Sequence, residues 1–170
     1  SEFANAGWLL ELPEDTVTDD TLEGIAETVR WDDGIYAAPL WANTQVLWFR
    51  RSLAEEAGLD MSQPVTWDQV IEAAASVEGA TVGVQANKYE AYVVWINAMI
   101  EGVGGQIIEN PQEGRDADVT LDTEAAAEAA RIIEKLASSE AAQGDLSVSN
   151  EGTALAYMYG EDIPGQFMTN

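Results

Sequence analysis

The sequence contains no cysteine and no histidine among its 170 residues. Without them the chain cannot form disulfides, cannot use a thiolate nucleophile or a Ser-His-Asp triad, and lacks the ligands of common zinc sites. It also has no apolar run approaching the roughly 20 residues that a membrane-spanning helix needs. These absences exclude several classes of enzyme and metal site, while the redox compartment stays undecided.

Positive charge is scarce. Seven basic residues stand against 31 acidic ones, which gives a formal net charge of −24. Such a chain repels the phosphate backbone of nucleic acids and the anionic heads of lipids, so we expect no nucleic-acid partner. We interpret the charge as a device for solubility. A calcium-buffering role would need a D-x-D-x-D-G loop, and Asp116-Ala117-Asp118 alone is too little for one. We therefore predict no metal site.

The motifs of common enzymes are missing as well. The sequence has no G-x-G-x-x-G, no G-x-x-x-x-G-K-[ST] and no G-x-S-x-G. The glycine-rich run at 102–105 follows a predicted helix rather than a strand, so it indicates a helix end. Carboxylates are so frequent that no particular pair marks a glycosidase. We predict no catalytic residue and no cofactor, with an enzyme acting on carbohydrate as an alternative.

What the chain does contain is enough apolar material for a globular fold. Hydrophobic residues make up 46% of it, and its length suits one domain or parts of two. Helices are expected at 3–12, around 25–29, and at 52–58, 67–77, 89–101, 123–138 and 151–159. Strands are expected at 35–39, 45–50, 81–85, 106–108 and 166–168. This mixed order predicts an α/β sheet with helices on its faces.

Several of these helices carry capping signals. Capping boxes are expected at Ser52–Glu55 and Thr66–Gln69, where a hydroxyl and a carboxylate or amide satisfy free amides at the start of a helix. Asp122 is the expected N-cap of the longest helix. Gly58 suits the left-handed conformation that ends a helix.

The aromatic residues are weighted toward those with a polar group. Six Trp and five Tyr outnumber three Phe. Such rings suit a wet, stacking site better than a dry core. Even so, we expect Trp48, Trp67 and Trp95 in the core, and Trp8 and Trp31 in packing contacts or at the surface.

Two stretches combine aromatic and amide or carboxylate side chains. Trp41, Asn43 and Gln45 alternate along APLWANTQVLWFR, which places them on one side of an extended chain. Gln85 to Tyr92 lies at a predicted strand-to-helix junction, and ligands of open α/β sheets bind beyond the carboxyl ends of strands. Amides and carboxylates can bind sugar hydroxyls while rings cover the apolar face. At this point ligand contact and a structural role are equally open for these polar residues.

Four stretches in order carry a resemblance to a known family. EFANAGWLLEL, YAAPLWANTQVLWFRR, PVTWDQVIEAA and YEAYVVWINAMIEGVGGQI resemble the extracellular solute-binding proteins of sugar ABC importers. The type is that of maltose and trehalose binders, closest to actinobacterial trehalose-binding lipoproteins. The resemblance implies an α/β fold of periplasmic-binding-protein-like type II. Two lobes joined by crossing strands close on sugar.

The resemblance also implies that the chain is a fragment of such a protein. Residues 1–43 would be the end of the N-terminal segment of the first lobe with a crossing strand, and residues 44–170 the first part of the second lobe. The stretch YMYGEDIP at 157–164 departs from the basic or polar turn expected before the last strand.

Ligand contacts follow from the resemblance residue by residue. It assigns Asn43 as the polar contact at the lobe crossing, with Trp41 and Gln45 on either side of it. From the second lobe it assigns the Glu90 carboxylate and the stacking ring of Tyr92. From the first lobe it assigns Glu2. Asn150 and Glu151 lie in a stretch that is expected to face the cleft.

The function implied is binding rather than catalysis. We expect the substrate-binding component of an ABC transporter, which captures a disaccharide such as trehalose or maltose and delivers it to membrane permease subunits. It would be a monomer without cofactors, outside the cell, held by a lipid anchor or free in the periplasm. The alternatives are an enzyme acting on carbohydrate and a binder of non-sugar solutes on the same fold.

Overall fold

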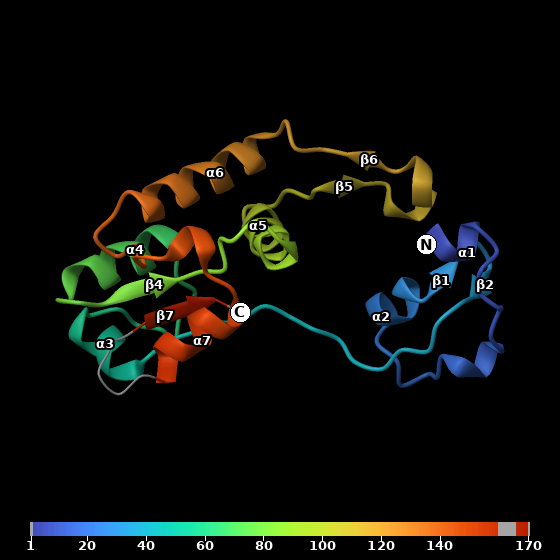
Figure 1. Ribbon diagram of the computed structural model, residues 1–170, viewed down its shortest axis with the longest axis horizontal. Coiled ribbons are helices and arrows are strands. Elements are labelled where there is room, and N and C mark those ends of the chain that lie inside the picture. Colours follow the sequence, from blue (N-terminus) through green and yellow to red (C-terminus); the bar gives the residue numbers. More distant parts are fainter. Residues whose placement is uncertain (1, 160–165, 170) are drawn as a thin grey trace. The chain divides into compact units, whose positions relative to one another are not determined.

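The computed structural model describes residues 2–159 and 166–169 of the chain (Figure 1). The chain divides into two compact units. Unit 1 comprises Ser1–Thr44 and Asn110–Asp118, and unit 2 comprises Gln45–Glu109 and Val119–Asn170. The chain therefore passes from one unit to the other after Thr44, after Glu109 and after Asp118.

Unit 2 is built on a three-stranded sheet in the order β3-β7-β4. The strands are β3 (Leu47–Trp48), β4 (Thr81–Gly83) and β7 (Gln166–Thr169). The central strand β7 pairs antiparallel with β3 and parallel with β4. All three strands fall within or overlap the predicted ranges, although β3 and β4 are shorter than the apolar runs that suggested them.

Among the described residues of unit 2, five helices accompany this sheet. They are α3 (Arg51–Glu56), α4 (Trp67–Ser76), α5 (Glu90–Gly102), α6 (Glu124–Ala137) and α7 (Glu151–Tyr159), with a short 3₁₀ turn η3 (Leu146–Val148) before the last. Strands and helices are mixed along the chain as the sequence predicted, and the boundaries of α4, α5 and α6 differ from the predicted ones by one residue. The departure predicted at 157–164 lies outside the described residues from residue 160 on.

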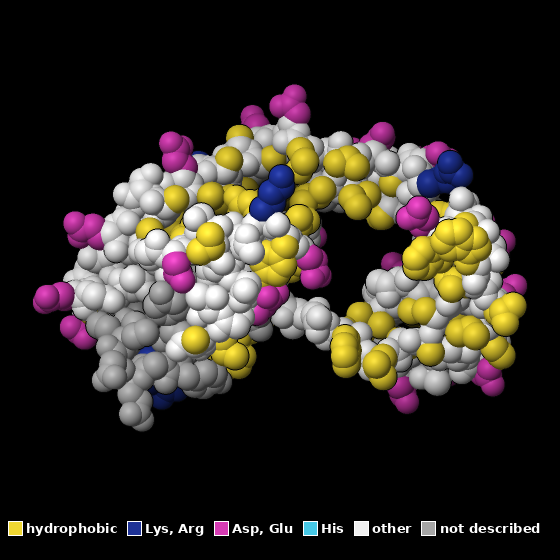
Figure 2. All heavy atoms as spheres, viewed as in Figure 1, with side chains coloured by type: hydrophobic (Ala, Val, Ile, Leu, Met, Phe, Trp, Pro, Cys, Tyr) yellow, Lys and Arg dark blue, Asp and Glu magenta, His cyan; other side chains and the backbone are white. Residues whose placement is uncertain are grey.

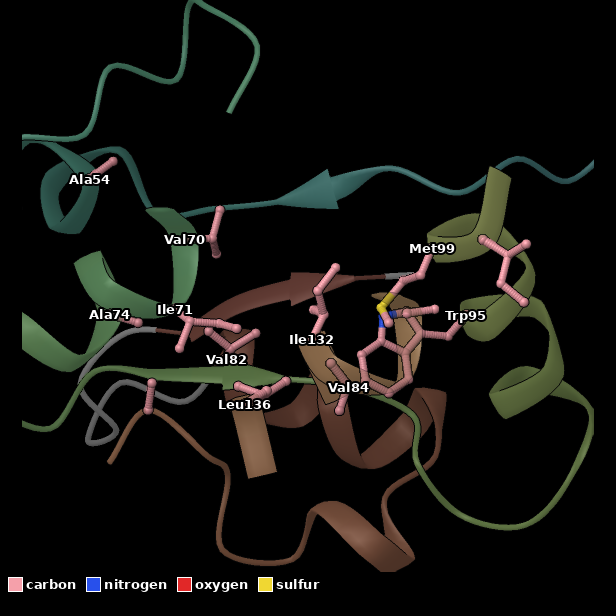
Figure 3. Close-up of a cluster of buried hydrophobic side chains, with 13 residues drawn as sticks. Ala54, Val70, Ile71, Ala74, Val82, Val84, Trp95, Met99, Ile132 and Leu136 are labelled. Atoms are coloured by element: carbon pink, nitrogen blue, oxygen red, sulfur yellow. The ribbon is translucent and has the colours of Figure 1, made fainter. Parts of the chain in front are cut away.

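The core of unit 2 gathers side chains from four helices and β4 (Figure 3). Trp95, Ile71, Ile100, Leu136 and Val82 are all less than 2% exposed. Burial of such side chains is the main stabilising contribution to a domain of this size, at roughly 1.5–3 kcal/mol each. The core therefore fixes α4, α5 and α6 relative to β4.

Of the three tryptophans predicted for this core, two pack in it and one does not. Trp95 is 1% exposed, and Trp67 packs against it edge-on at a centroid distance of 6.3 Å. The prediction was wrong for Trp48, which is 54% exposed. Its neighbour Leu47 packs against the core, and successive side chains of a strand point to opposite faces, so Trp48 is directed outward.

Some of the predicted helix caps are confirmed and others were wrong. At α4 the capping box is confirmed, because the Gln69 amide donates to Thr66 Oγ1 at 3.2 Å and the Thr66 amide donates to Gln69 Oε1 at 2.8 Å. Gly58 has φ +70, in the left-handed region as expected. The box at Ser52 was wrong, since α3 already begins at Arg51 and no side-chain hydrogen bond caps its start.

The predicted cap of α6 is displaced by one residue. The N-cap is Thr123 rather than Asp122, and Thr123 Oγ1 accepts the Ala126 amide at 3.1 Å. Asp and Thr are both good N-cap residues, so the sequence alone could not decide which of these two neighbours caps the helix.

Unit 1 contains only short elements. They are α1 (Glu2–Asn5), η1 (Glu14–Thr16), α2 (Glu23–Thr28), the hairpin strands β1 (Arg30–Trp31) and β2 (Gly34–Ile35), and η2 (Pro111–Asp116). The strands β5 (Ile108–Glu109) and β6 (Asp118–Val119), where the chain passes between the units, pair with each other. The strands β1 and β2 pair antiparallel, with Trp31 opposite Gly34.

The helix predicted over residues 3–12 was wrong in length. It ends at Asn5 because Gly7 adopts a left-handed conformation with φ +71, and the Trp8 amide turns back to the Phe3 carbonyl at 3.0 Å. Trp8 and Leu10 are then 73% and 86% exposed. Within the described chain, no helix has the length and apolar character needed to cross a membrane.

Candidate functional site

The predicted strand-to-helix junction exists in unit 2 between β4 and α5. Gln85, two residues beyond the strand, is 3% exposed, and Tyr89 is the N-cap of α5 with an extended backbone and no side-chain cap. The helix then begins at Glu90. The candidate ligand residues Glu90 and Tyr92 therefore occupy the first turn of a helix that starts just beyond the carboxyl end of a strand.

Glu90 and Tyr92 present different faces of that turn. Two residues correspond to about 200° around the helix axis. Glu90 is exposed and makes no hydrogen bond or ion pair among the described residues. The half-buried ring of Tyr92 packs against Trp95 at a centroid distance of 6.0 Å and a tilt of 35°. The structure thus places a carboxylate with unused acceptor oxygens and an anchored aromatic ring in the same helical turn, on different faces of it.

A polar contact joins this junction to the start of α7. The Tyr89 hydroxyl donates to the Glu151 carboxylate, and the Glu151 amide donates to the same hydroxyl oxygen at 3.3 Å. Burial, reinforced by the Glu151 contact and the nearby Glu90 charge, raises the pKa of Tyr89 to about 12. The phenol therefore stays protonated, and able to donate, throughout the physiological pH range.

A second contact lies beside the first. The Asn87 amide donates to the Ser149 carbonyl at 3.1 Å. Ser149 is fully buried, and its hydroxyl accepts a bond of 3.2 Å from the Gln143 side chain, which is 3% exposed. The next residue, Asn150, caps α7 through its side-chain oxygen, which accepts the Thr153 amide at 3.0 Å. The loop before α7 is therefore held by buried polar contacts.

The crossing stretch has no regular secondary structure. Residues 36–46 form neither helix nor strand. Trp41 is 78% exposed, Asn43 is exposed and Gln45 is half-buried. The first two belong to unit 1 and the third to unit 2. Neither amide side chain has a hydrogen bond among the described residues, so both retain donors and acceptors for a ligand.

Glu2 lines a hollow of about 430 Å³ in unit 1, together with Asn5, Trp31, Gly114 and Arg115. Trp31 lies so close to Gly114 that a Cβ added there would be 3.2 Å from the ring. The sequence alone did not identify Trp31 or Arg115 as lining residues. The available signal for Trp31 was its place directly before the turn-forming residues Asp32-Asp33-Gly34, and nothing in the sequence marked Arg115.

The main ion-pair cluster lies away from these residues, between α4 and α6. Asp68 is 3.1 Å from Arg131 and 2.8 Å from Lys135, which also pairs with Glu72 at 2.8 Å. Hydrogen bonds from Lys135 and Arg131 lower the pKa of Asp68. Elsewhere acidic side chains are scattered over the surface (Figure 2). The described residues include no group of three or more side chains suited to hold a metal ion.

Comparisons with known proteins agree on one family. A family model described as bacterial extracellular solute-binding protein matches residues 1–166. Among curated proteins, the mannitol-binding protein of Pseudomonas aeruginosa is 35% identical over 72 residues, which are 41% of this chain and 16% of that protein. Among solved structures, the GacH receptor of Streptomyces glaucescens GLA.O, determined without ligand and with acarbose or an acarbose homolog, is 28% identical with a TM-score of 0.73.

Two further solved structures share the fold. An ABC transporter solute-binding protein from Thermotoga lettingae TMO, bound to α-D-tagatose, is 19% identical with a TM-score of 0.80. A solute-binding protein from Agrobacterium vitis S4, with bound D-mannitol, is 19% identical with a TM-score of 0.73. Each of the three alignments covers 99% of this chain, against 42%, 44% and 42% of the respective solved chains.

These likenesses confirm the predicted fold class, an α/β fold of the periplasmic-binding-protein type. The matched family consists of binding proteins, which confirms the prediction that the chain does not belong to an enzyme. The chain spans less than half the length of the proteins it matches. The assignment of 1–43 and 44–170 to two lobes, and the six ligand contacts, stay predictions.

Proposed function

The chain belongs to the family of bacterial extracellular solute-binding proteins, and from this premise we propose that it serves in the substrate-binding component of an ABC importer for a sugar or sugar alcohol. The observation that carries the proposal is the start of α5. There Glu90, an exposed carboxylate without a protein partner among the described residues, shares the first helical turn with the anchored ring of Tyr92, beyond the end of β4. Hydroxyl-rich ligands need acceptors and an aromatic face of this kind.

Within this class, we propose a disaccharide such as trehalose or maltose as the ligand. The GacH receptor, with 28% identity, binds acarbose, a ligand that supports a carbohydrate site here. Two relatives have tagatose or mannitol bound, so a monosaccharide or a polyol is the nearest alternative to a disaccharide ligand. The strongly negative chain argues against anionic solutes, since like charges repel a ligand before it reaches its site.

Six residues are proposed to contact the ligand. Carboxylates and amides fix the pattern of hydroxyl groups, while the Trp41 and Tyr92 rings cover apolar faces. The six are Glu2, Trp41, Asn43, Gln45, Glu90 and Tyr92. They come from both compact units, three from each. Contacts of this kind give binding without any chemical step.

The partners follow from this role. The closed, loaded protein would dock onto the permease subunits of the importer in the membrane, as a monomer and without a cofactor. Its place is outside the cytoplasmic membrane, as the family description indicates, either in the periplasm or held to the cell surface by a lipid anchor.

The proposal is tested by a calorimetric titration of the full-length protein that contains this chain. The ligands are trehalose, maltose, D-mannitol, D-tagatose and spermidine, and the variants are Asn43→Ala and Glu90→Ala. We expect one carbohydrate to bind at micromolar concentration, and each variant to weaken its binding at least tenfold, which is about 1.4 kcal/mol. Glu134→Ala, an exposed carboxylate on α6 without side-chain partners among the described residues, is the matched control and should bind as the wild type does.

The possible outcomes separate the parts of the proposal. A response to spermidine alone would replace the sugar with a non-sugar solute. A response to mannitol or tagatose alone would keep the importer and discard the disaccharide. Carbohydrate binding unchanged in both variants would keep the function and discard Asn43 and Glu90 as contacts. Turnover of a glycoside by the purified protein would contradict the binding role.

A further inference from the structure

The first turn of α5 lacks a side-chain N-cap, the usual means by which the start of a helix is fixed. Its N-cap, Tyr89, has φ −160 and ψ −169 and makes no side-chain bond to the free amides of the helix start. By contrast, α4 and α6 each begin with a threonine that caps its own helix. An uncapped start frays more readily, because its first amides have no partner within the helix. Yet Glu90 and Tyr92, the proposed ligand contacts, lie in this turn.

The side chain of Tyr89 is used for a contact with another helix instead. Its hydroxyl both donates to the Glu151 carboxylate and accepts the Glu151 amide, so two bonds close between the same two residues. Glu151 is the first residue of α7, and its amide is one of the donors left free at a helix start. One phenol thus ties the first turn of α5 to the first turn of α7.

The support behind this tie is buried and polar. The Asn87 amide bonds to the Ser149 carbonyl, so the loops before the two helices are joined a second time. The Ser149 hydroxyl in turn accepts a hydrogen bond from the Gln143 side chain, and both residues are at least 97% buried. Hydrogen bonds away from water hold a geometry more firmly than exposed ones do. The Tyr89–Glu151 contact therefore rests on a loop that is itself fixed.

We propose that Tyr89 and Glu151 are positioning residues for the binding site. They set the orientation of the first turn of α5 against α7, and so place Glu90 and Tyr92 for a hydroxyl-rich ligand before it arrives. This inference rests on the proposed function. It assigns Tyr89 and Glu151 no direct contact with the ligand, and it makes the affinity depend on their mutual hydrogen bond.

The test is a double-mutant cycle on ligand affinity in the full-length protein. The probe is trehalose, or whichever of maltose, D-mannitol and D-tagatose the wild type binds, titrated at a temperature where every variant is folded. The variants are Tyr89→Phe, Glu151→Ala and the two combined. Tyr89→Phe removes both bonds, and Glu151→Ala removes the bond to the carboxylate while keeping the backbone amide. We therefore expect each to weaken binding roughly three- to tenfold, with the combined variant no weaker than Tyr89→Phe.

Two further variants complete the design. Glu151→Gln keeps an oxygen that can accept the Tyr89 hydroxyl, and should recover most of the affinity lost in Glu151→Ala. Tyr36→Phe, in unit 1, removes a hydroxyl that has no hydrogen bond among the described residues, and should bind as the wild type does. A residue that merely stabilises the fold would lower the melting temperature without producing this pattern in affinity.

Four results would overturn the positioning role. Lowered stability with unchanged affinity would make the contact purely structural. Additive losses in the combined variant would show that the two residues act separately, with Glu151 then a ligand contact in its own right. If Glu90→Ala weakens binding while Tyr89→Phe does not, the positioning role fails and the proposed function stands. If the wild type binds no probe, both are rejected together.

Discussion

The two units of this chain bury apolar side chains to very different extents. Unit 2 encloses a core of thirteen buried residues that includes Trp95. In the described part of unit 1, the buried hydrophobic residues are Ala4 and Ile35 alone. Apolar side chains instead gather on the surface of unit 1 (Figure 2). Those more than half exposed there are Phe3, Trp8, Leu10, Leu22, Leu40 and Trp41.

This difference has a thermodynamic meaning. Apolar burial is the main favourable contribution to folding, at about 25 cal/mol per Å². Unit 2 has the helices and strands to achieve it from its own residues, whereas unit 1 has elements of a few residues each. We therefore expect the stability of the chain to reside in unit 2, with unit 1 opening first.

The largest expected effect is that of Trp95→Ala in unit 2. The side chain is 1% exposed and contacts the rings of Trp67 and Tyr92. Its removal should cost roughly 3–5 kcal/mol of unfolding free energy, as for other buried aromatic residues. Urea denaturation followed by circular dichroism measures this loss.

Trp48→Ala is the matched control, because it removes the same side chain from a position that is 54% exposed in the same unit. It should cost less than about 1 kcal/mol. Equal losses in the two variants would mean that the core does not lie where the structure places it.

A smaller and more local effect is expected from Ile35→Ala in unit 1. Ile35 is 1% exposed, but it lies among half-exposed residues that can relax into the space it leaves. We expect a cost of about 2 kcal/mol, at the low end for such a truncation. Hydrogen exchange should show loss of protection in β1 and β2 with no change in β4 and α5.

Leu40→Ala, at a position 83% exposed in the same unit, should leave exchange unaltered. Equal loss of protection in both units after Ile35→Ala would show that they unfold as one cooperative body. The distinction between a stable and a less stable unit would then be lost.

The smallest effect is expected from the ion pairs between α4 and α6. Because Lys135 and Arg131 lower the pKa of Asp68, its contribution to stability is present above the unfolded-state pKa of about 3.9. That contribution is lost as the pH falls through the lower folded-state pKa. Asp68→Asn should lower the melting temperature slightly at pH 7, less in high salt, and not at all in strong acid. An undiminished effect in 1 M salt would contradict an exposed ionic origin.

The sequence predicted unit 2 better than unit 1 for a physical reason. Helices α4, α5 and α6 follow local signals, an apolar period and a cap, that act over a few residues. The end of α1 depends on Gly7 adopting a left-handed conformation, and glycine permits this without requiring it. The grouping of Asn110–Asp118 with unit 1 depends on contacts such as Trp31 with Gly114, which no local pattern encodes.

The candidate site shows the same limit. The junction that carries Glu90 was predictable, because a β-branched run followed by a helical period places it beyond a strand end. The Tyr89–Glu151 contact joins residues 62 positions apart and leaves no mark in either segment. Pairs of this kind become visible only when the chain is folded, although both residues lie in stretches that the sequence singled out.

The strand order of unit 2 has a consequence for how the chain is made. A ribosome releases β3 first, then β4, and β7 only much later, yet β7 is the strand that joins the other two. Leu47 can pair only after Thr169 has been synthesised, and Val82 only after Phe167 has been synthesised. Until then two strand edges stay open to wrong partners, and sheets closed by such distant segments form slowly. We therefore expect the sheet of unit 2 to close only after β7 has been synthesised.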